Sequence, residues 1–255
     1  MKIVYGPVSS WRLGRSLGID LICSPKKICS FDCIYCQLEN TNRITCKREK
    51  FVPIEQIKKE VKNALKKTKQ DVITLSGMGE PTLAKNIDEI IPFLRQESNS
   101  PLAILTNSSL FYDSNVKKSL NKLDIIVAKL DASNEELFNK ISKPAEGITF
   151  EKTIKGIKNL RKNYHGKFAL QIMFMDENKD FANDLAEITR EIKPDEVQIN
   201  TPLRPCNIKP LSVEELDKIE KKFSGLNTIS VYHSTKPKTD PLSKVELLKR
   251  RRMEL

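Results

Sequence analysis

The chain has 255 residues, of which 39% are hydrophobic and 30% are charged, and its formal net charge is +11. This composition excludes a disordered chain, and the length suffices for one large α/β domain. No segment approaches the ~18 consecutive apolar residues of a membrane span, and the first residues lack the apolar block of a signal peptide, so we expect a cytoplasmic protein.

Short apolar runs alternate with amphipathic segments along the chain. The first strand is expected at 17–22, and the first helix, at 54–67, carries Ile57, Val61 and Leu65 on one face. Ser212 and Glu215 form a capping-box pattern at the start of the last long helix. Further strands are expected at 72–75, 103–105, 125–130, 168–174, 197–199 and 229–232, and further helices at 87–95, 115–120, 150–161, 181–192 and 213–223.

This alternation predicts an α/β fold in which parallel strands are joined by right-handed crossovers. Six or seven such units suit an open barrel better than a flat sheet, so we expect a partial (βα)6 TIM-like barrel of parallel strands with short N- and C-terminal extensions. The core domain is expected at 17–234. An N-terminal arm at 1–16 precedes it, and a basic tail at 235–255 follows it and ends in a short basic helix.

Polar or glycine-containing segments follow the expected strands. Ser76-Gly77-Met78-Gly79-Glu80-Pro81 follows one strand, Thr106 and Asn107 follow the next, and Asp131 and Asn200 follow later ones. In a parallel βα barrel these positions share one rim, at the carboxyl ends of the strands, where ligands bind. The simpler interpretation is that each loop is polar for local reasons.

Three of the six cysteines, Cys29, Cys33 and Cys36, have the spacing C-x3-C-x2-C after the first strand. Clustered thiols in a reducing compartment indicate metal ligands more than disulfides. Three thiolates can hold three irons of a cubane cluster and leave the fourth iron open. Zinc is the competing interpretation, but structural zinc sites usually take four protein ligands in two close pairs, and only Cys23 and Cys46 lie nearby.

The pattern Cys-x3-Cys-x-aromatic-Cys, with Tyr35 before the last cysteine, resembles the signature of the radical SAM superfamily. The segments 5–7, 12–20 and 35–38 resemble a subgroup related to the tRNA wyosine-base (4-demethylwyosine) synthases. The resemblance covers Tyr5 to about Pro205. This chain departs from those synthases upstream of the motif. The synthases have three cysteines there for a second cluster, and this chain has only Cys23.

The resemblance implies a [4Fe–4S] cluster on the three cysteines, with S-adenosyl-L-methionine (SAM) chelating the open iron. It implies that the turn around Glu80 accepts from the SAM amino group and that Tyr35 lies near the adenine. It also implies an external electron donor such as a flavodoxin or ferredoxin. The implied SAM-binding residues are Tyr35, Gly77, Gly79, Glu80, Thr106, Asn107, Asp131 and Asn200.

The expected activity is reductive cleavage of SAM to a 5′-deoxyadenosyl radical that attacks a substrate. The charge and the subgroup favour tRNA, while a peptide or small metabolite, or a non-catalytic zinc- or RNA-binding module, are the alternatives. Residues 249–252 are four consecutive cations, and we expect them to help hold tRNA together with Arg12 and Arg15 on the rim. The two arginines could equally lock the N-terminal arm through salt bridges. We expect Cys23, Cys46 and Cys206 to be ordinary thiols.

Overall fold

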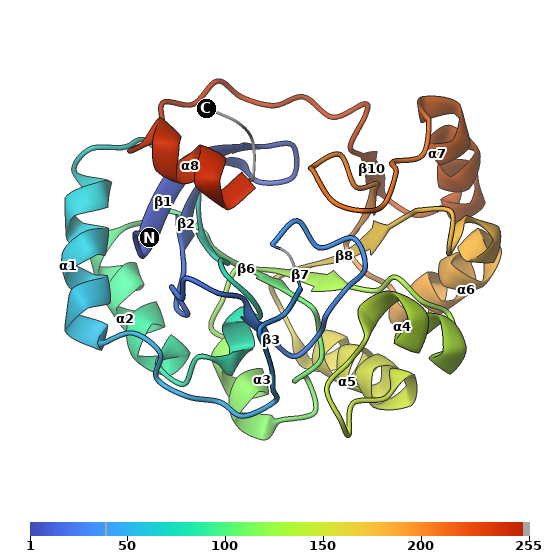
Figure 1. The fold of residues 1–255 in the computed structure, drawn as a ribbon, viewed down its shortest axis with the longest axis horizontal. Helices are drawn as coiled ribbons and strands as arrows, with labels where there is room; N and C mark the ends of the chain where they lie inside the picture. Colours follow the sequence, from blue (N-terminus) through green and yellow to red (C-terminus); the bar gives the residue numbers. More distant parts are fainter. Residues whose placement is uncertain (39, 252–255) are drawn as a thin grey trace.

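The computed structural model describes residues 1–38 and 40–251 (Figure 1). Its strands are β1 (Val4–Ser10), β2 (Gly14–Ile19), β3 (Ile28–Cys29), β4 (Arg43–Ile44), β5 (Val72–Leu75), β6 (Leu102–Thr106), β7 (Ile125–Lys129), β8 (Lys167–Met173), β9 (Glu196–Asn200) and β10 (Thr228–Ser230). Its α-helices are α1 (Ile54–Leu65), α2 (Ile87–Glu97), α3 (Ser114–Leu120), α4 (Glu135–Ser142), α5 (Phe150–Asn163), α6 (Ala182–Ile192), α7 (Val213–Glu220) and α8 (Lys244–Arg251). Short 3-10 helices lie at η1 (Pro81–Leu83), η2 (Lys179–Phe181) and η3 (Lys221–Phe223).

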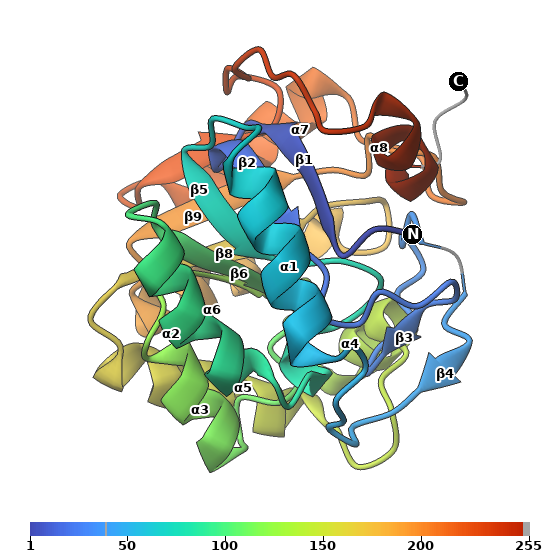
Figure 2. The same ribbon diagram turned by 90° about the vertical axis from the view of Figure 1, so that its left-hand side faces the viewer.

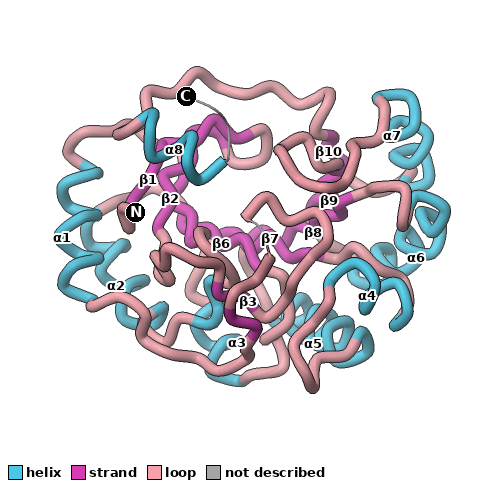
Figure 3. The backbone as a smooth tube through the Cα atoms, in the orientation of Figure 1, coloured by secondary structure: helices cyan, strands magenta, loops and turns pink. Residues whose placement is uncertain are grey.

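Eight strands form one sheet in the order β1-β2-β5-β6-β7-β8-β9-β10. β1 and β2 are antiparallel, and every other neighbouring pair in this sheet is parallel. The sheet curls into a half-barrel with helices along its outer face (Figures 1 and 3). Figure 2 shows α1, α2 and α3 side by side over this outer face. The expectation of a partial TIM-like barrel is therefore confirmed.

The two faces of the sheet differ in chemistry because side chains alternate along a strand. On β9, Val197 and Ile199 belong to the hydrophobic core under the helices. Glu196, Gln198 and Asn200 therefore lie on the opposite face, which is the inside of the half-barrel. The outer face carries the main core, and the inner face is left for polar side chains and ligands.

The amino-terminal part of the fold differs from the expectation. The expected arm at 1–16 forms β1 and the start of β2, and the expected strand at 17–22 begins earlier, at Gly14. The sequence pattern did not predict β1 because of the Gly6-Pro7 pair: proline interrupts a strand pattern and is tolerated mainly at sheet edges. β1 is such an edge, and its register with β2 shifts between Tyr5 and Val8.

The carboxyl-terminal tail crosses the open side of the half-barrel. It leaves β10 at one edge of the sheet and reaches β1 at the other (Figures 1 and 3). Ser9 Oγ donates to the Pro237 carbonyl at 2.7 Å, and the Leu242 amide donates to the Gly6 carbonyl at 2.6 Å. The tail then ends in the expected short basic helix, α8. Arg252, which we also expected in the cationic end, lies outside the described residues.

A second, smaller hydrophobic cluster supports the loop that carries the cysteines. Phe31 of this loop packs edge-on against Phe138 of α4, with ring centroids 5.4 Å apart. The Asp32 and Ile34 amides donate to carbonyls at the end of α4. The sequence pattern did not reveal α4, which has only eight residues. Within the described residues, no helix is long and apolar enough to cross a membrane.

Candidate active site

The three motif cysteines lie together at the carboxyl ends of the barrel strands. Cys29 is buried at the end of β3, and Cys33 and Cys36 are half-buried in the turn that follows, where the Cys36 amide donates to the Cys33 carbonyl at 3.0 Å. Lys129 Nζ lies 3.1 Å from Cys33 Sγ, and Asn107 Nδ2 lies 3.6 Å from Cys29 Sγ. Two polar side chains from neighbouring strands thus direct hydrogen atoms at the thiol sulfurs.

The donor set fits a cubane cluster. Three thiols of one short loop can each bind a different iron. In the described part of the chain, no three His, Cys, Asp or Glu side chains are close enough to share one metal ion. Each remaining cysteine has its own surroundings: Cys23 Sγ lies 3.7 Å from the Met1 carbonyl, Cys206 Sγ lies 3.4 Å from the Ile208 carbonyl, and Cys46 packs against the core.

The glycine turn after β5 is locked to the cysteine loop by its backbone. The Ile28 amide donates to the Met78 carbonyl at 3.1 Å, and Ile28 and Gly79 form a parallel bridge. Gly79 has φ of +145°, and a Cβ there would lie 1.6 Å from the Ile28 carbonyl oxygen. A Cβ on Gly77 would lie 2.1 Å from the Asp20 carboxyl carbon. Both glycines are therefore required by contacts within the protein itself.

Glu80 is buried, and protein donors occupy both of its carboxylate oxygens. Oε1 accepts from the Thr82 amide at 3.0 Å and from the hydroxyls of Thr82 and Thr106 at 2.7 Å each. Oε2 accepts from the Asn107 amide at 2.7 Å. Oε2 therefore keeps a lone-pair position beyond the bond from Asn107. Glu80 holds the turns after β5 and β6 together. Its expected contact with the SAM amino group stays a prediction.

Asn107 connects this network to the cysteines. Its Nδ2 donates to Ser30 Oγ at 2.8 Å, and Ser30 Oγ in turn lies 2.6 Å from Ser109 Oγ. Its Oδ1 accepts from the Ser109 amide at 3.0 Å. Asn107 therefore fixes the residue that follows Cys29 and orients its own amide toward the thiol.

Tyr35, Lys129 and Asp131 form a second buried group beside the cysteines. The Tyr35 hydroxyl donates to the Asp131 carboxylate, and Lys129 Nζ lies 3.1 Å from Asp131 Oδ2. Burial acts to lower the pKa of Lys129, but the charges of Cys33 and Asp131 outweigh it and the net shift is upward. We missed Lys129 in the sequence, although a lysine ending the apolar strand Ile-Ile-Val-Ala-Lys was a usable signal.

Asn200 lies at the carboxyl end of β9, on the inner face. Its Oδ1 accepts from the Thr201 amide at 3.0 Å, so its side chain is held locally. Among the described residues it has no hydrogen bond to the other expected site residues. Its contact with SAM stays a prediction, as do the SAM contacts of Tyr35, Gly77, Gly79, Thr106, Asn107 and Asp131.

Comparison with known families agrees with this geometry. A family model described as the radical SAM superfamily matches residues 24–192, which include the cysteine loop, the glycine turn and the Tyr35 group. The chain belongs to the radical SAM superfamily. It is thus a radical SAM enzyme, with SAM as its cofactor.

Several proteins resemble this radical SAM enzyme along most of its length. It is 40% identical over 212 residues to a UPF0026 protein of Synechocystis sp., covering 83% of this chain and 78% of the relative. A UPF0026 protein of Methanocaldococcus jannaschii is 36% identical over 235 residues, covering 89% and 72%. A protein named GTPase Obg from Brachyspira hyodysenteriae is 36% identical over 237 residues, and this chain spans 35% of its length.

Solved structures share the fold. SuiB of Streptococcus suis bound to S-adenosylmethionine gives a TM-score of 0.62 at 17% identity, over 83% of this chain and 50% of that chain. The enzyme anSMEcpe with bound AdoMet gives 0.62 at 20% identity, over 85% and 64%. Archaeal TYW1 gives 0.56 at 14% identity, over 84% and 72%. At these identities the likeness establishes the half-barrel architecture alone.

The arginines that we expected to contact RNA have other surroundings in this radical SAM enzyme. Arg12 and Arg15 flank the β1–β2 turn, at the amino end of β2 and away from the rim. Arg15 is paired with Asp71, its Nη2 lying 2.5 Å from Oδ1. Arg250 is buried: its Nη1 lies 2.8 Å from Asp20 Oδ2, and its guanidinium lies 4.2 Å from the centre of the Tyr5 ring. Arg250 is thus engaged inside the fold, whereas Arg15 is paired at the surface and its contact with RNA stays a prediction.

The Arg250–Asp20 pair is expected to stabilise the glycine turn. Asp20 Oδ2 also accepts from the Met78 amide at 3.1 Å, so the ion pair connects α8 to the glycine turn beside the cysteine loop. Arg250→Met leaves the Asp20 charge without its buried partner, and we expect the free energy of unfolding to fall by about 3–5 kcal/mol. Urea unfolding measures this. The exposed neighbour Lys249→Met is the matched control, and an equal effect of both substitutions would refute the proposed connection.

Proposed function

We propose that Cys29, Cys33 and Cys36 hold a [4Fe–4S] cluster and that the enzyme uses it to cleave SAM reductively. When bound and reduced, such a cluster supplies the electron that splits SAM into methionine and a 5′-deoxyadenosyl radical. The observation that carries the proposal is the bridge between Ile28 and Gly79, which joins the cysteine loop to the glycine turn. An external donor such as a flavodoxin or ferredoxin is the proposed source of the electron.

The surrounding residues support this function by holding and tuning the site. Hydrogen bonds from Lys129 and Asn107 to thiol sulfurs act on a cluster's reduction potential, because donors stabilise added negative charge. Glu80 fixes the two turns that flank the site. Phe31 and Phe138 pack between the cysteine loop and α4, and this apolar contact keeps water from that side of the cysteine loop.

Anaerobic reconstitution tests this function. Protein supplied with iron and sulfide, then with SAM and dithionite, should form 5′-deoxyadenosine. Formation of the product settles the reaction class without knowledge of the substrate. If correctly folded, iron-loaded protein gives none, the proposed cleavage is wrong.

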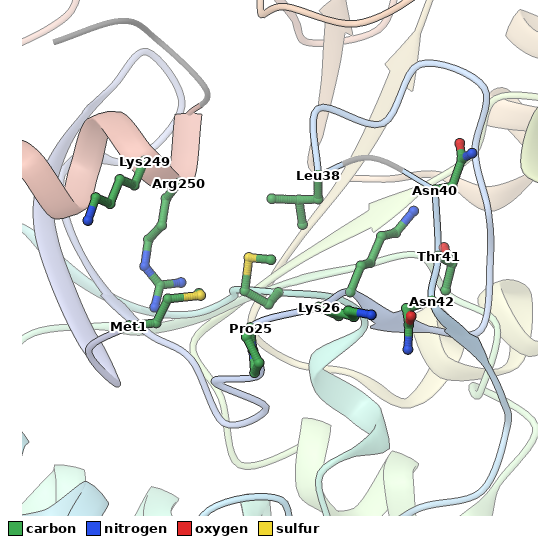
Figure 4. Close-up of a pocket in the computed structure, with 11 residues that line it drawn as sticks. Met1, Pro25, Lys26, Leu38, Asn40, Thr41, Asn42, Lys249 and Arg250 are labelled. Carbon is green, nitrogen blue, oxygen red and sulfur yellow. The ribbon is translucent and has the colours of Figure 1, made fainter.

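For the substrate we propose an anion, with tRNA as the candidate. A cavity of about 450 Å³ lies between the cysteine loop and α8 (Figure 4). Its lining includes Lys26, Lys27, Lys249 and Arg250 and, among the described residues, no acidic side chain. Arg250 is paired with Asp20 and Lys27 with Asp32, so Lys26 and Lys249 are the cations we assign to substrate phosphates.

Binding of tRNA is expected to weaken steeply with salt, because phosphate contacts release counterions. Each contact contributes a log–log slope of about −0.7 to −0.9. Lys26→Gln and Lys249→Gln should each make the slope shallower by about one such contact in fluorescence anisotropy of labelled tRNA. Lys59→Gln, an exposed lysine of α1, is the control. Negligible binding of tRNA at low salt would exclude RNA as the substrate and favour a peptide or small metabolite instead.

A further inference from the structure

After the motif, the chain returns to the cysteine loop as the short strand β4. This strand pairs in parallel with β3, and the register places Ile44 opposite Cys29. The amide of the next residue, Thr45, donates to the Cys29 carbonyl at 3.0 Å. Neighbouring strands lie about 4.7–4.9 Å apart. Ile44, which is 47% exposed, therefore joins a proposed iron ligand to the protein surface.

The outer edge of β4 is free. Among the described residues, β3 and β4 are the two strands of this small sheet, and Figure 2 shows β4 at the outside of the molecule with β3 between it and the barrel. Soluble proteins normally protect such an edge with charged side chains or with a covering segment, because it otherwise pairs with another chain. An exposed isoleucine on this edge is therefore a feature that a partner protein can use.

Tyr112 adds a second exposed side chain beside the cysteine loop, with an exposed fraction of 51%. It follows Ser109, whose Oγ lies 2.6 Å from Oγ of Ser30 in the cysteine loop. Burial and then the charge of Cys46, which follows β4, raise the pKa of Tyr112. The tyrosine thus lies near the segment that carries Ile44.

This segment, residues 43–50, is basic. In the described part of the chain, the carboxylates within ion-pair distance of its four cations are Glu49 and Glu89; the cations are Arg43, Lys47, Arg48 and Lys50. Arg48 donates to the backbone carbonyls of Thr82 and Ala84, which carry no formal charge. The side chain of Lys47 is 77% exposed, and its Nζ lies 3.7 Å from Glu49 Oε1. Segment 43–50 therefore carries an excess of positive charge around Ile44.

The chemistry of this surface indicates a partner with an acidic face. An apolar centre with a charged rim is the usual anatomy of a protein–protein interface. A second copy of this chain has the same net charge of +11 and the same basic segment, so the two copies repel each other. A protein that delivers electrons to the cysteine loop has to bring its redox centre close to that loop, because electron transfer slows steeply with distance.

We propose that Ile44, Tyr112 and the basic segment 43–50 form the docking surface for the electron donor, a small acidic protein with a flavin or iron–sulfur centre at its surface. The docking surface rests on the proposed function, since the donor supplies the electron for the cluster on the three cysteines. One electron leaves the reduced centre of the donor and reduces the cluster, and no atom is transferred. Complexes of this kind are small and transient, and opposite charges speed their formation.

Binding of the oxidised donor tests the docking surface directly. Anaerobically reconstituted enzyme is titrated into a dye-labelled acidic [2Fe–2S] ferredoxin and, separately, into a labelled acidic flavodoxin, and fluorescence anisotropy is recorded at several salt concentrations. We expect saturable binding of at least one donor, and the binding should weaken as salt rises because exposed charges are screened. Absence of salt-dependent binding of both donors overturns the proposal.

Two variants locate the contact on the surface of the enzyme. Ile44→Glu and Lys47→Glu place a negative charge against the acidic donor, and each should raise the Kd roughly tenfold or more. Val213→Glu on α7 and Lys59→Glu on α1, both at exposed positions, change the net charge by the same amounts and are the matched controls. If each variant and its control have equal effects, net charge governs the binding and the proposed surface is wrong.

The rate of cluster reduction connects binding to electron transfer. Reduction by the reduced donor, followed as the loss of cluster absorption in stopped flow, should slow in Ile44→Glu and Lys47→Glu by a factor similar to the change in Kd. Complete reduction of each variant by dithionite, which needs no docking surface, shows that its cluster is intact. If the two variants weaken tRNA binding and leave donor binding unchanged, the surface binds RNA and the proposal is wrong. Failure of the wild type to form 5′-deoxyadenosine with dithionite contradicts the proposed cleavage instead, because that reaction uses no protein donor.

Discussion

Replacing Cys29, Cys33 or Cys36 singly with Ala is expected to abolish both the cluster and the formation of 5′-deoxyadenosine. Each thiolate is the sole protein ligand of one iron in the proposed site, and the loop has no spare cysteine to substitute for it. The anaerobically reconstituted wild-type protein should contain about four irons with matching sulfide. Iron and labile-sulfide analysis, with the charge-transfer absorption of the cluster, measures the loss.

The other cysteines supply matched controls for this experiment. Cys46→Ala removes a half-buried thiol that packs against the core, and Cys206→Ala removes one whose Sγ lies 3.4 Å from the Ile208 carbonyl. Both variants should keep iron and activity near normal. One tightly bound zinc without labile sulfide in the wild type would contradict the cluster assignment. Loss of iron in either control would mean that the ligand set differs.

Glu80→Ala is expected to have the second-largest effect, on stability and SAM binding together. The substitution leaves the Thr82 and Asn107 amides and the Thr106 hydroxyl without their buried acceptor. Each unsatisfied buried group costs about 1–3 kcal/mol, so the turns after β5 and β6 should loosen. We expect the affinity for SAM to fall by on the order of 1.5–3 kcal/mol, while the cysteines keep their iron.

Two measurements separate these effects. SAM titration followed by the EPR signal of the cluster gives the affinity, and urea unfolding gives the stability. Glu89→Ala, an exposed carboxylate of α2 paired with Lys50, is the control, because surface ion pairs contribute about 0–1 kcal/mol. If Glu80→Ala lowers stability but leaves the SAM affinity unchanged, the turn is structural and does not position SAM.

The sequence by itself determined the features that depend on local spacing. Hydrophobic periodicity located most strands and helices to within a few residues, since burial on one face imposes a period that a short window reveals. Alternating strands and helices predicted the parallel half-barrel, and the spacing of Cys29, Cys33 and Cys36 indicated a metal-binding loop. Strand ends of a parallel barrel share one rim, so the sequence also indicated the neighbourhood of Glu80, Asn107 and Asp131.

Only the tertiary structure decided what the side chains of that neighbourhood contact. Arg250 meets Asp20 across 230 residues of chain, and no local pattern encodes such a pairing. The hydrogen bonds of the Glu80 carboxylate, the approach of Lys129 to Cys33 and the unpaired atoms of Arg12 and Gln198 likewise depend on segments that only folding brings together. Two residues of the same type can therefore differ in role: one is paired within the fold, and the other is available to a ligand. The difference depends on their neighbours in space, because a buried polar group needs hydrogen-bond partners that only the folded chain brings to it.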